Sequence, residues 1–218
     1  METDGIDPYT CSPVQLAAVM VDPIRLEIIK DSEFNINLKP EKLDGVVDNP
    51  YKDSDILDWH AKVRASTADN ILSEWQSYPS QNKSWDMFLT YLEKYHYRSG
   101  KKTMFSAPVA AGYNIFRFDL KIVERLSKKY NNVNNEGTSC LFYPRDTLDV
   151  MNLIFYWFEG SKEIKKLSMD ALREYLGIPI KGGHDALKDV RDTAEILIRF
   201  LKLHRKLFEK IKFKDSFV

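Results

Sequence analysis

The sequence predicts a mixed α/β fold in which a β-sheet is flanked by helices. Strand-forming runs come first in the chain, and beyond residue 103 short buried strands alternate with amphipathic helices. The chain has 218 residues, which is enough for a sizeable domain with a full hydrophobic core. Its 44% of hydrophobic and 29% of charged residues are typical of a globular protein and argue against disorder.

The first part of the chain predicts a β-hairpin followed by a loop. Residues 13–39 contain two β-rich runs, and the turn dipeptide Asp22-Pro23 would fold one run back on the other. Residues 40–55 are rich in Pro, Gly, Asn and Asp, which are typical of a loop.

Two amphipathic helices are predicted next. Residues 56–78 and residues 84–99 each have the apolar spacing of a helix, with a breaker-rich link between them. Ser84 is a plausible N-cap for the second helix. We interpret residues 56–98 as a helical insertion in one domain that spans residues 1–218.

The second half of the chain predicts the alternation of strands and helices. The expected order is a buried strand, a helix, a strand that turns into a helix, a short helix and a long last helix. These elements fall at residues 103–114, 116–130, 139–158, 168–178 and about 185–210.

Charge and cysteine content narrow the classes of function. Thirty-two basic and 32 acidic residues give zero net charge, so binding to a polyanion cannot depend on overall attraction. Cys11 and Cys140 form no zinc-binding pattern and suit a reducing compartment. The longest apolar run, residues 150–158, is too short to span a bilayer, and the N-terminus does not resemble a signal peptide. We therefore expect a cytoplasmic protein with no membrane partner.

The start of the last helix combines an apolar stripe with a histidine and aspartates. Asp189 lies beside the stripe, and its neighbours one turn away, Ala186 and Thr193, are small enough for a cation to approach. His184 follows two glycines, so its imidazole would lie in a loop at the helix start. The helix dipole alone also favours acidic residues here, and that alternative stays open. The stripe itself consists of Leu187, Val190, Ala194, Leu197 and Leu201.

Two other segments supply further carboxylates. Asp119 stands near a helix start, after a strand and a Gly-Tyr-Asn turn, which is the usual setting of a site residue in an α/β sheet. Glu2, Asp4 and Asp7 surround a glycine turn at the start of the chain. Carboxylates gathered from separate segments repel one another, so a fold that collects them needs a cation. Oxygen ligands without cysteine point to Mg²⁺ or Mn²⁺.

These segments resemble the motifs of the DnaQ-like, or DEDDh, 3′→5′ exonucleases, a family of the ribonuclease H-like superfamily. "ETDGIDP" is similar to the end of the first motif, "GYNIFRFD" to the second and "HDALKDV" to the third. Within the family, the sequence is most similar to that of bacterial exonuclease I. The resemblance covers nearly the whole chain, and residues 56–98 are the least similar part. It implies a ribonuclease H-like mixed β-sheet flanked by helices, with a helical insertion.

The resemblance also implies a catalytic centre. Glu2, Asp119 and Asp189 would be metal ligands, and His184 would take the proton from the attacking water. Two Mg²⁺ or Mn²⁺ ions would hold the attacking and leaving oxygens at phosphorus. The implied reaction is hydrolysis of phosphodiester bonds at the 3′ end of single-stranded or frayed DNA, with release of nucleoside 5′-monophosphates.

Substrate contacts and alternatives follow from the same resemblance. Thr3, Gly5 and Ile6 would line the terminal nucleotide, with Ile6 against its base, and Asn114 would help to order the site. Packing alone for Ile6, and a turn alone for Asn114, remain open. The expected partner is a single-stranded nucleic acid with a free 3′ end. Two alternative functions are an exoribonuclease that trims RNA and a non-catalytic module that binds nucleic acid or a polymerase.

The first motif differs from the family in one respect. The family begins this motif with an aspartate two positions before the glutamate, whereas Met1 directly precedes Glu2 here. We expect the chain to start at an internal methionine of a longer protein whose upstream strand ends in that aspartate. A degraded or non-catalytic relative is the alternative. The first central strand of the sheet is then expected to be missing, and the 218-residue chain to have weak or no nuclease activity.

Overall fold

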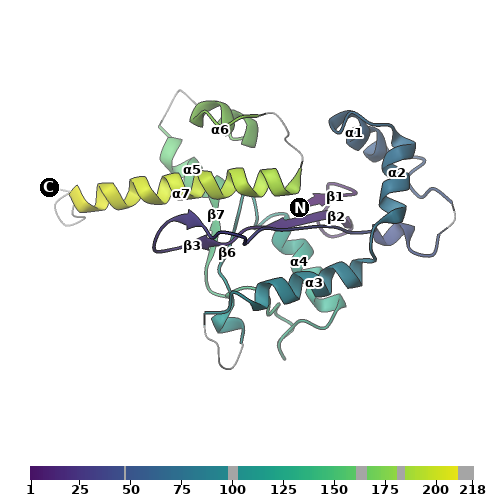
Figure 1. Cartoon of the computed structure of the whole chain (residues 1–218), viewed down its shortest axis with the longest axis horizontal. Coiled ribbons are helices and arrows are strands. Elements are labelled where there is room, and N and C mark those ends of the chain that lie inside the picture. The colour runs from purple at the N-terminus through teal and green to yellow at the C-terminus, as the bar shows by residue number, and fades with distance from the viewer. Residues whose placement is uncertain (47, 98–102, 161–165, 181–184, 211–218) are drawn as a thin grey trace.

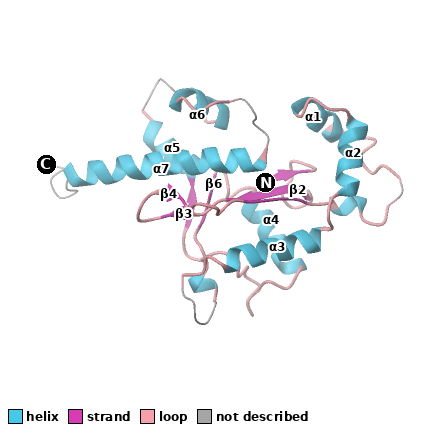
Figure 2. Ribbon diagram, in the orientation of Figure 1, coloured by secondary structure: helices cyan, strands magenta, loops and turns pink. Residues whose placement is uncertain are grey.

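A computed structural model describes residues 1–46, 48–97, 103–160, 166–180 and 185–210 of the chain (Figure 1). Strands come first and then alternate with helices, which confirms the predicted mixed α/β fold (Figure 2). The elements are β1 (Glu2–Thr3), β2 (Pro13–Ala18), β3 (Val21–Asp22), β4 (Glu27–Ile28), β5 (Phe34–Asn37), η1 (Glu41–Leu43), α1 (Ile56–Val63), α2 (Ala68–Ser77), α3 (Gln81–Glu93), η2 (Met104–Ser106), β6 (Ala110–Gly112), α4 (Asp119–Lys129), β7 (Thr147–Asp149), α5 (Val150–Phe158), α6 (Met169–Leu176) and α7 (Ala186–Lys210).

The described strands form separate small sheets. Strand β2 lies between β1 and β5 in an antiparallel sheet, where Leu16 is opposite Ile36. The pairing of β2 with β5 confirms the predicted hairpin, and β3 and β4 extend it as a ribbon around the Asp22-Pro23 turn. Strands β6 and β7 are parallel, with Gly112 opposite Asp149.

Helices cover both faces of the β2–β5 pair. Because strand side chains alternate, Leu16 points to one face, where it packs against α3 and α4 in a core that includes Trp85 and Ile122. The neighbouring residue Gln15 points to the opposite face, where it contacts the start of α7. Figure 1 shows α7 and α3 on different sides of these strands. Full burial of each large apolar side chain in such a core contributes about 1.5–3 kcal/mol.

Helix α7 is long, and two of its arginines contact residues between the strands. Arg191 forms an ion pair with Glu33 beside β5, and the Arg205 guanidinium donates to the carbonyl oxygen of Ile24 in the β3–β4 turn at 2.7 Å. Ala194 and Leu197 of the predicted apolar stripe are buried. No helix in the described ranges, α7 included, combines the length and the hydropathy that are needed to cross a bilayer.

Residues 56–78 differ from the prediction of a single helix. These residues form two helices, α1 and α2, because Ala65 adopts a left-handed conformation with a φ of 50° and ends the first. The Thr67 side chain then accepts a hydrogen bond from the Asn70 amide and caps the second. The apolar spacing continues across this break, so periodicity alone predicted one helix.

The predicted cap of the next helix is also wrong. Helix α3 begins at Gln81, and its N-cap residue is Ser80. Ser84 lies inside the helix, and its hydroxyl donates to the carbonyl oxygen of Asn37 at 3.1 Å, which ties α3 to the end of β5.

A cavity of about 560 Å³ separates the β2 and β6 strands. Strand β1 accompanies β2 only as far as Gln15, so Leu16–Ala18 have no described strand beside them on that side. Strand β6 pairs with β7 alone among the described strands. The expected missing strand concerns residues before Met1 and stays a prediction.

Candidate active site

The three carboxylates that the sequence predicts as metal ligands line this one cavity. Glu2 lies in β1, Asp119 is the first residue of α4, and Asp189 lies in the first turn of α7. The small neighbours Ala186 and Thr193 line the cavity beside Asp189. Segments that are far apart in the sequence therefore bring acidic side chains to a common space.

The N-terminal ammonium group of Met1 lies among these carboxylates. Its nitrogen is 2.9 Å from Oδ1 of Asp119. Burial lowers the pKa of this ammonium, but the nearby charges of Asp119, Glu2 and Asp189, with the hydrogen bond to Asp119, outweigh burial and raise it. The Met1 ammonium is therefore expected to stay charged beside Asp119.

These donors suit a divalent cation in their chemistry. Carboxylate oxygens are the ligands that Mg²⁺ and Mn²⁺ prefer, and three carboxylates line this cavity. Within the described parts of the chain, however, no group of three or more Asp, Glu, His or Cys side chains has the spacing to hold a metal ion. Metal binding by Glu2, Asp119 and Asp189 stays a prediction.

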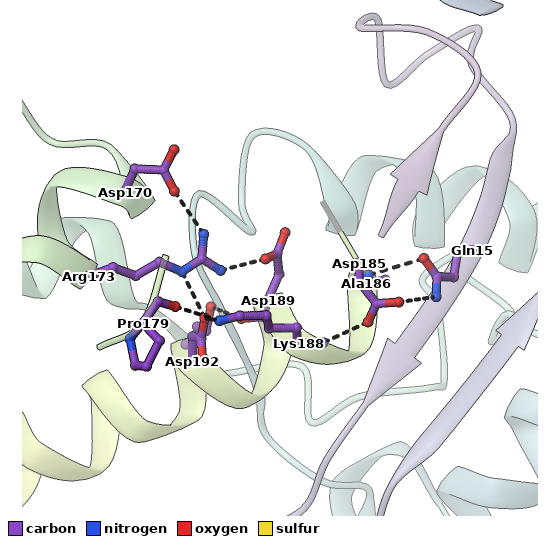
Figure 3. Close-up of polar contacts among 10 residues, drawn as sticks. Gln15, Asp170, Arg173, Pro179, Asp185, Ala186, Lys188, Asp189 and Asp192 are labelled. Carbon is purple, nitrogen blue, oxygen red and sulfur yellow. Dashed lines mark hydrogen bonds and ion pairs between the residues drawn. The ribbon is translucent and has the colours of Figure 1, made fainter. Parts of the chain in front are cut away.

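A buried arginine from α6 holds Asp189. Arg173 donates through Nη2 to Oδ1 of Asp189 at 2.5 Å, through Nε to Oδ2 of Asp192 at 2.8 Å and through Nη1 to Oδ1 of Asp170 at 3.0 Å (Figure 3). Arg173 is not among the residues predicted from the sequence. A signal was present, because Arg173 occupies the apolar face of α6 at helical spacing from Met169.

A glutamine from β2 fixes the first turn of α7. The Ala186 amide donates to Oε1 of Gln15 at 3.1 Å, and Nε2 of Gln15 donates to Oδ2 of Asp185 at 3.4 Å (Figure 3). Asp185 in turn accepts from the amide of Lys188 at 2.9 Å. The turn that carries Asp189 is therefore anchored to the sheet. The predicted base, His184, lies outside the described residues.

Solved structures with the same architecture are nucleases. Exonuclease I from E. coli in complex with a 5cy-dT13 oligonucleotide has a TM-score of 0.62 and 17% identity, and the match covers 96% of this chain and 41% of that one. The cell-death related nuclease 4 (CRN-4) has a TM-score of 0.61 and 17% identity over 93% of this chain and 62% of that one. The chain has the exonuclease I fold.

The exonuclease I fold confirms the predicted ribonuclease H-like architecture and the resemblance to DnaQ-like exonucleases at the level of the fold. A moderately thermophilic exonuclease I from Methylocaldum szegediense has a TM-score of 0.59 and 21% identity, and the match covers 95% of this chain and 40% of that one. The chain thus spans less than two thirds of the length of these nucleases. A scan of protein-family models and a search of curated proteins found no match.

The residues that resemble the first motif form a compact turn after β1. The Thr3 hydroxyl donates to the carbonyl oxygen of Gly5 at 2.7 Å. Ile6 is 92% exposed, so it has no packing role within the described structure, and the packing alternative is wrong. Asp4 is buried and accepts hydrogen bonds from Ser12 and Tyr51, so its role is structural. Substrate contacts of Thr3, Gly5 and Ile6 stay a prediction.

The segment that resembles the second motif is a tight turn between β6 and α4. Asn114 has a left-handed φ of 56°, and its amide donates to Oδ1 of Asp149 at 3.0 Å, as the turn-shaping alternative expects. Asp149 also caps α5 through the amide of Met151. Burial, and then the charge of Asp149, raise the pKa of Tyr113 to about 12, so this phenol stays neutral. This turn sets the position of Asp119.

Proposed function

We propose that the chain is a metal-dependent 3′→5′ exonuclease that acts on single-stranded or frayed DNA and releases nucleoside 5′-monophosphates. The observation that carries the proposal is the convergence of Glu2, Asp119 and Asp189 on one cavity. The similarity in fold to exonuclease I, which has been solved with oligonucleotides, supports a nucleic-acid substrate. We place the activity in the cytoplasm.

Each residue of the site has a task in the proposed reaction. Divalent cations, when bound, would neutralise the charge that develops on the phosphate and favour attack by water. Glu2, Asp119 and Asp189 would hold these cations through carboxylate oxygens. His184 would take the proton from the attacking water as a general base. The exposed side chain of Ile6 is free to lie against the terminal base.

Thr3, Gly5 and Asn114 complete the proposed substrate site. Thr3 and Gly5 would line the terminal nucleotide, and Asn114 would order the turn that precedes Asp119. We further propose that the 218-residue chain is a weak enzyme, because the aspartate that opens the family's first motif is not among its residues. The test must therefore detect slow hydrolysis.

The test uses single-stranded DNA labelled at its 5′ end, with Mg²⁺ or Mn²⁺ and the protein in excess. We expect slow shortening of the strand from its 3′ end, one nucleotide at a time, and complete loss of activity with a chelator. Asp189→Asn and His184→Ala should abolish the products. Glu195→Gln is the matched control, because Glu195 is an exposed acid on α7 that pairs with Arg199.

Other outcomes would assign other functions. Shortening of RNA but not of DNA would favour the exoribonuclease that trims 3′ ends. Binding of single strands without cleavage would favour the non-catalytic module that binds nucleic acid or a polymerase. One observation favours this module: the guanidinium of Arg173 already forms an ion pair with Asp189. A protein that neither binds nor cleaves DNA or RNA would refute the proposal.

A further inference from the structure

Arg173 is a buried charge at the contact between α6 and α7. It is 2% exposed, and its guanidinium pairs with Asp170, Asp189 and Asp192. Burial lowers the pKa of this group, but its hydrogen bonds to the three carboxylates outweigh burial and raise it, so the guanidinium stays charged. A buried guanidinium requires such partners, because an unpaired charge in the protein interior is strongly destabilising.

The three carboxylates differ in what they contribute. Asp170 is largely exposed, and Asp192 is bound a second time by Nζ of Lys188 at 2.5 Å. Asp189 is the member of this group that lines the cavity. Figure 3 shows the Arg173 contact on one oxygen of Asp189 and draws no contact to the other. Asp170 and Asp192 can therefore keep Arg173 neutralised, while the contact with Asp189 connects Arg173 to the candidate active site.

We propose that Arg173 is a positioning residue that fixes the Asp189 side chain through Oδ1, leaves Oδ2 for the cavity and so sets the affinity for divalent cations. The inference rests on the proposed function. The guanidinium is planar and bonded at Nε and Nη2 to residues one turn apart on α7, so it cannot rotate without breaking both bonds. Loss of a hydrogen bond that orients a ligand typically weakens metal affinity about 10–100-fold.

The sign of the effect separates positioning from competition. An arginine that orients Asp189 strengthens cation binding, so its removal weakens binding. An arginine that only competes with the cation for the carboxylate has the opposite effect, and its removal tightens binding. The charge and geometry of Arg173 favour orientation, because Asp192 and Asp170 remain as its partners when Asp189 also contacts an ion.

The experiment measures Mn²⁺ binding by the electron paramagnetic resonance signal of the free ion. We expect Arg173→Met to raise the Mn²⁺ dissociation constant about 10-fold or more. Arg173→Lys keeps the charge but loses the fork of donors, so it should lie between Arg173→Met and the wild type. Arg199→Met is the matched control, because Arg199 also joins α7 to α6, through the carbonyl oxygen of Leu176 at 2.7 Å, and should leave binding unchanged.

Each outcome decides the inference. Unchanged or tighter Mn²⁺ binding by a folded Arg173→Met protein overturns it. If Arg173→Met does not fold, as judged by circular dichroism, Arg173→Lys decides, and wild-type affinity in that variant overturns the inference. Excess Mn²⁺ should also restore the kcat of Arg173→Met, which a purely structural defect would not allow.

Failure of the proposed function has a different signature. A wild-type protein that binds Mn²⁺ but cleaves neither DNA nor RNA refutes the nuclease, while the affinities of the Arg173 variants still decide this inference. A wild type that cleaves, with an Arg173→Met variant of equal Mn²⁺ affinity, refutes the inference alone. A wild type that binds no Mn²⁺ refutes both.

Discussion

The Tyr51 hydroxyl donates a hydrogen bond to Oδ2 of Asp4 at 2.6 Å and joins the loop before α1 to the first segment of the chain. Asp4 is 3% exposed and also accepts from the amide of Ser12 at 2.5 Å. The Tyr51 ring packs edge-on against the buried ring of Trp75. A buried carboxylate needs such donors, so this pair helps to hold the segment that carries Glu2.

Tyr51→Phe should lower the free energy of unfolding by about 1.5–3 kcal/mol, because a buried carboxylate loses a donor. Urea denaturation at neutral pH measures this difference. The control is Tyr156→Phe, since Tyr156 is 75% exposed, and its effect should stay within about 0.5 kcal/mol. Equal stability of Tyr51→Phe and the wild type would show that Asp4 does not depend on this donor.

The same pair predicts a dependence of stability on pH. Burial, followed by the hydrogen bond and the charge of Asp4, raises the pKa of Tyr51 far above its usual range. A raised pKa in the folded state means that the contribution of this phenol is complete below its unfolded pKa of about 10 and is lost as the pH rises beyond it. The stability difference between the wild type and Tyr51→Phe should therefore be constant near neutral pH and shrink in strong alkali. A difference that grows with pH would contradict the assignment.

Long periodic elements could be predicted from the sequence, whereas boundaries set by single residues could not. The apolar stripe predicted α7 to within a residue of its start at Ala186, because a repeated pattern is insensitive to one error. The break at Ala65 was missed, since a left-handed alanine has no signature in composition. Ser80 and Ser84 are equally good caps by residue type, but the helix begins after Ser80, and Ser84 instead contacts the end of β5.

The candidate site shows the same division. The convergence of Glu2, Asp119 and Asp189 could be predicted because each lies in a recognisable motif, and the structure places all three along one cavity. The position of Arg173 on the apolar face of α6 marked it as unusual, but its partner could not be predicted, and neither could that of Gln15, because these partners lie 16 and 171 residues away in the chain. Such contacts arise from how α6 and β2 pack against α7, which local patterns do not specify.

Gly112→Ala should destabilise the turn before α4. A β-carbon at Gly112 would lie 2.9 Å from Cδ1 of Ile115, closer than real contacts, and 3.0 Å from its Cβ, which is tighter than most real contacts. Overpacking of this kind typically costs about 1–3 kcal/mol. Thermal denaturation should show the loss, and adding Ile115→Val, which removes the closest atom, should recover part of it. A double variant no better than Gly112→Ala would place the strain elsewhere.

An apolar strand added before Met1 should stabilise the protein. Strand β1 runs antiparallel to β2, and Met1 lines the cavity, so added residues would follow β2 past Leu16 toward Ala18. The added residues would pair with the edge of β2 beyond Gln15 and bury apolar surface. Such burial stabilises the folded state by about 25 cal/mol per Å². We expect an extension of about six alternating Val and Thr residues to raise the unfolding temperature by at least about 4 °C over a Gly/Ser extension of equal length. Equal temperatures, measured by scanning calorimetry, would show that the cavity does not admit a strand.

Gln15→Ala should loosen the first turn of α7. The variant loses the acceptor for the Ala186 amide and the donor to Asp185, and a lost helix cap costs about 0.5–2 kcal/mol. Hydrogen exchange should become faster for the amides of Lys188 and Asp189, both of which donate to Asp185, and stay unchanged in the middle of α7. Gln76→Ala, at an exposed position of α2, is the control. Faster exchange confined to this turn would assign Gln15 the local task of holding the backbone of Asp189, whereas unchanged exchange would mean that α7 keeps its first turn without the sheet.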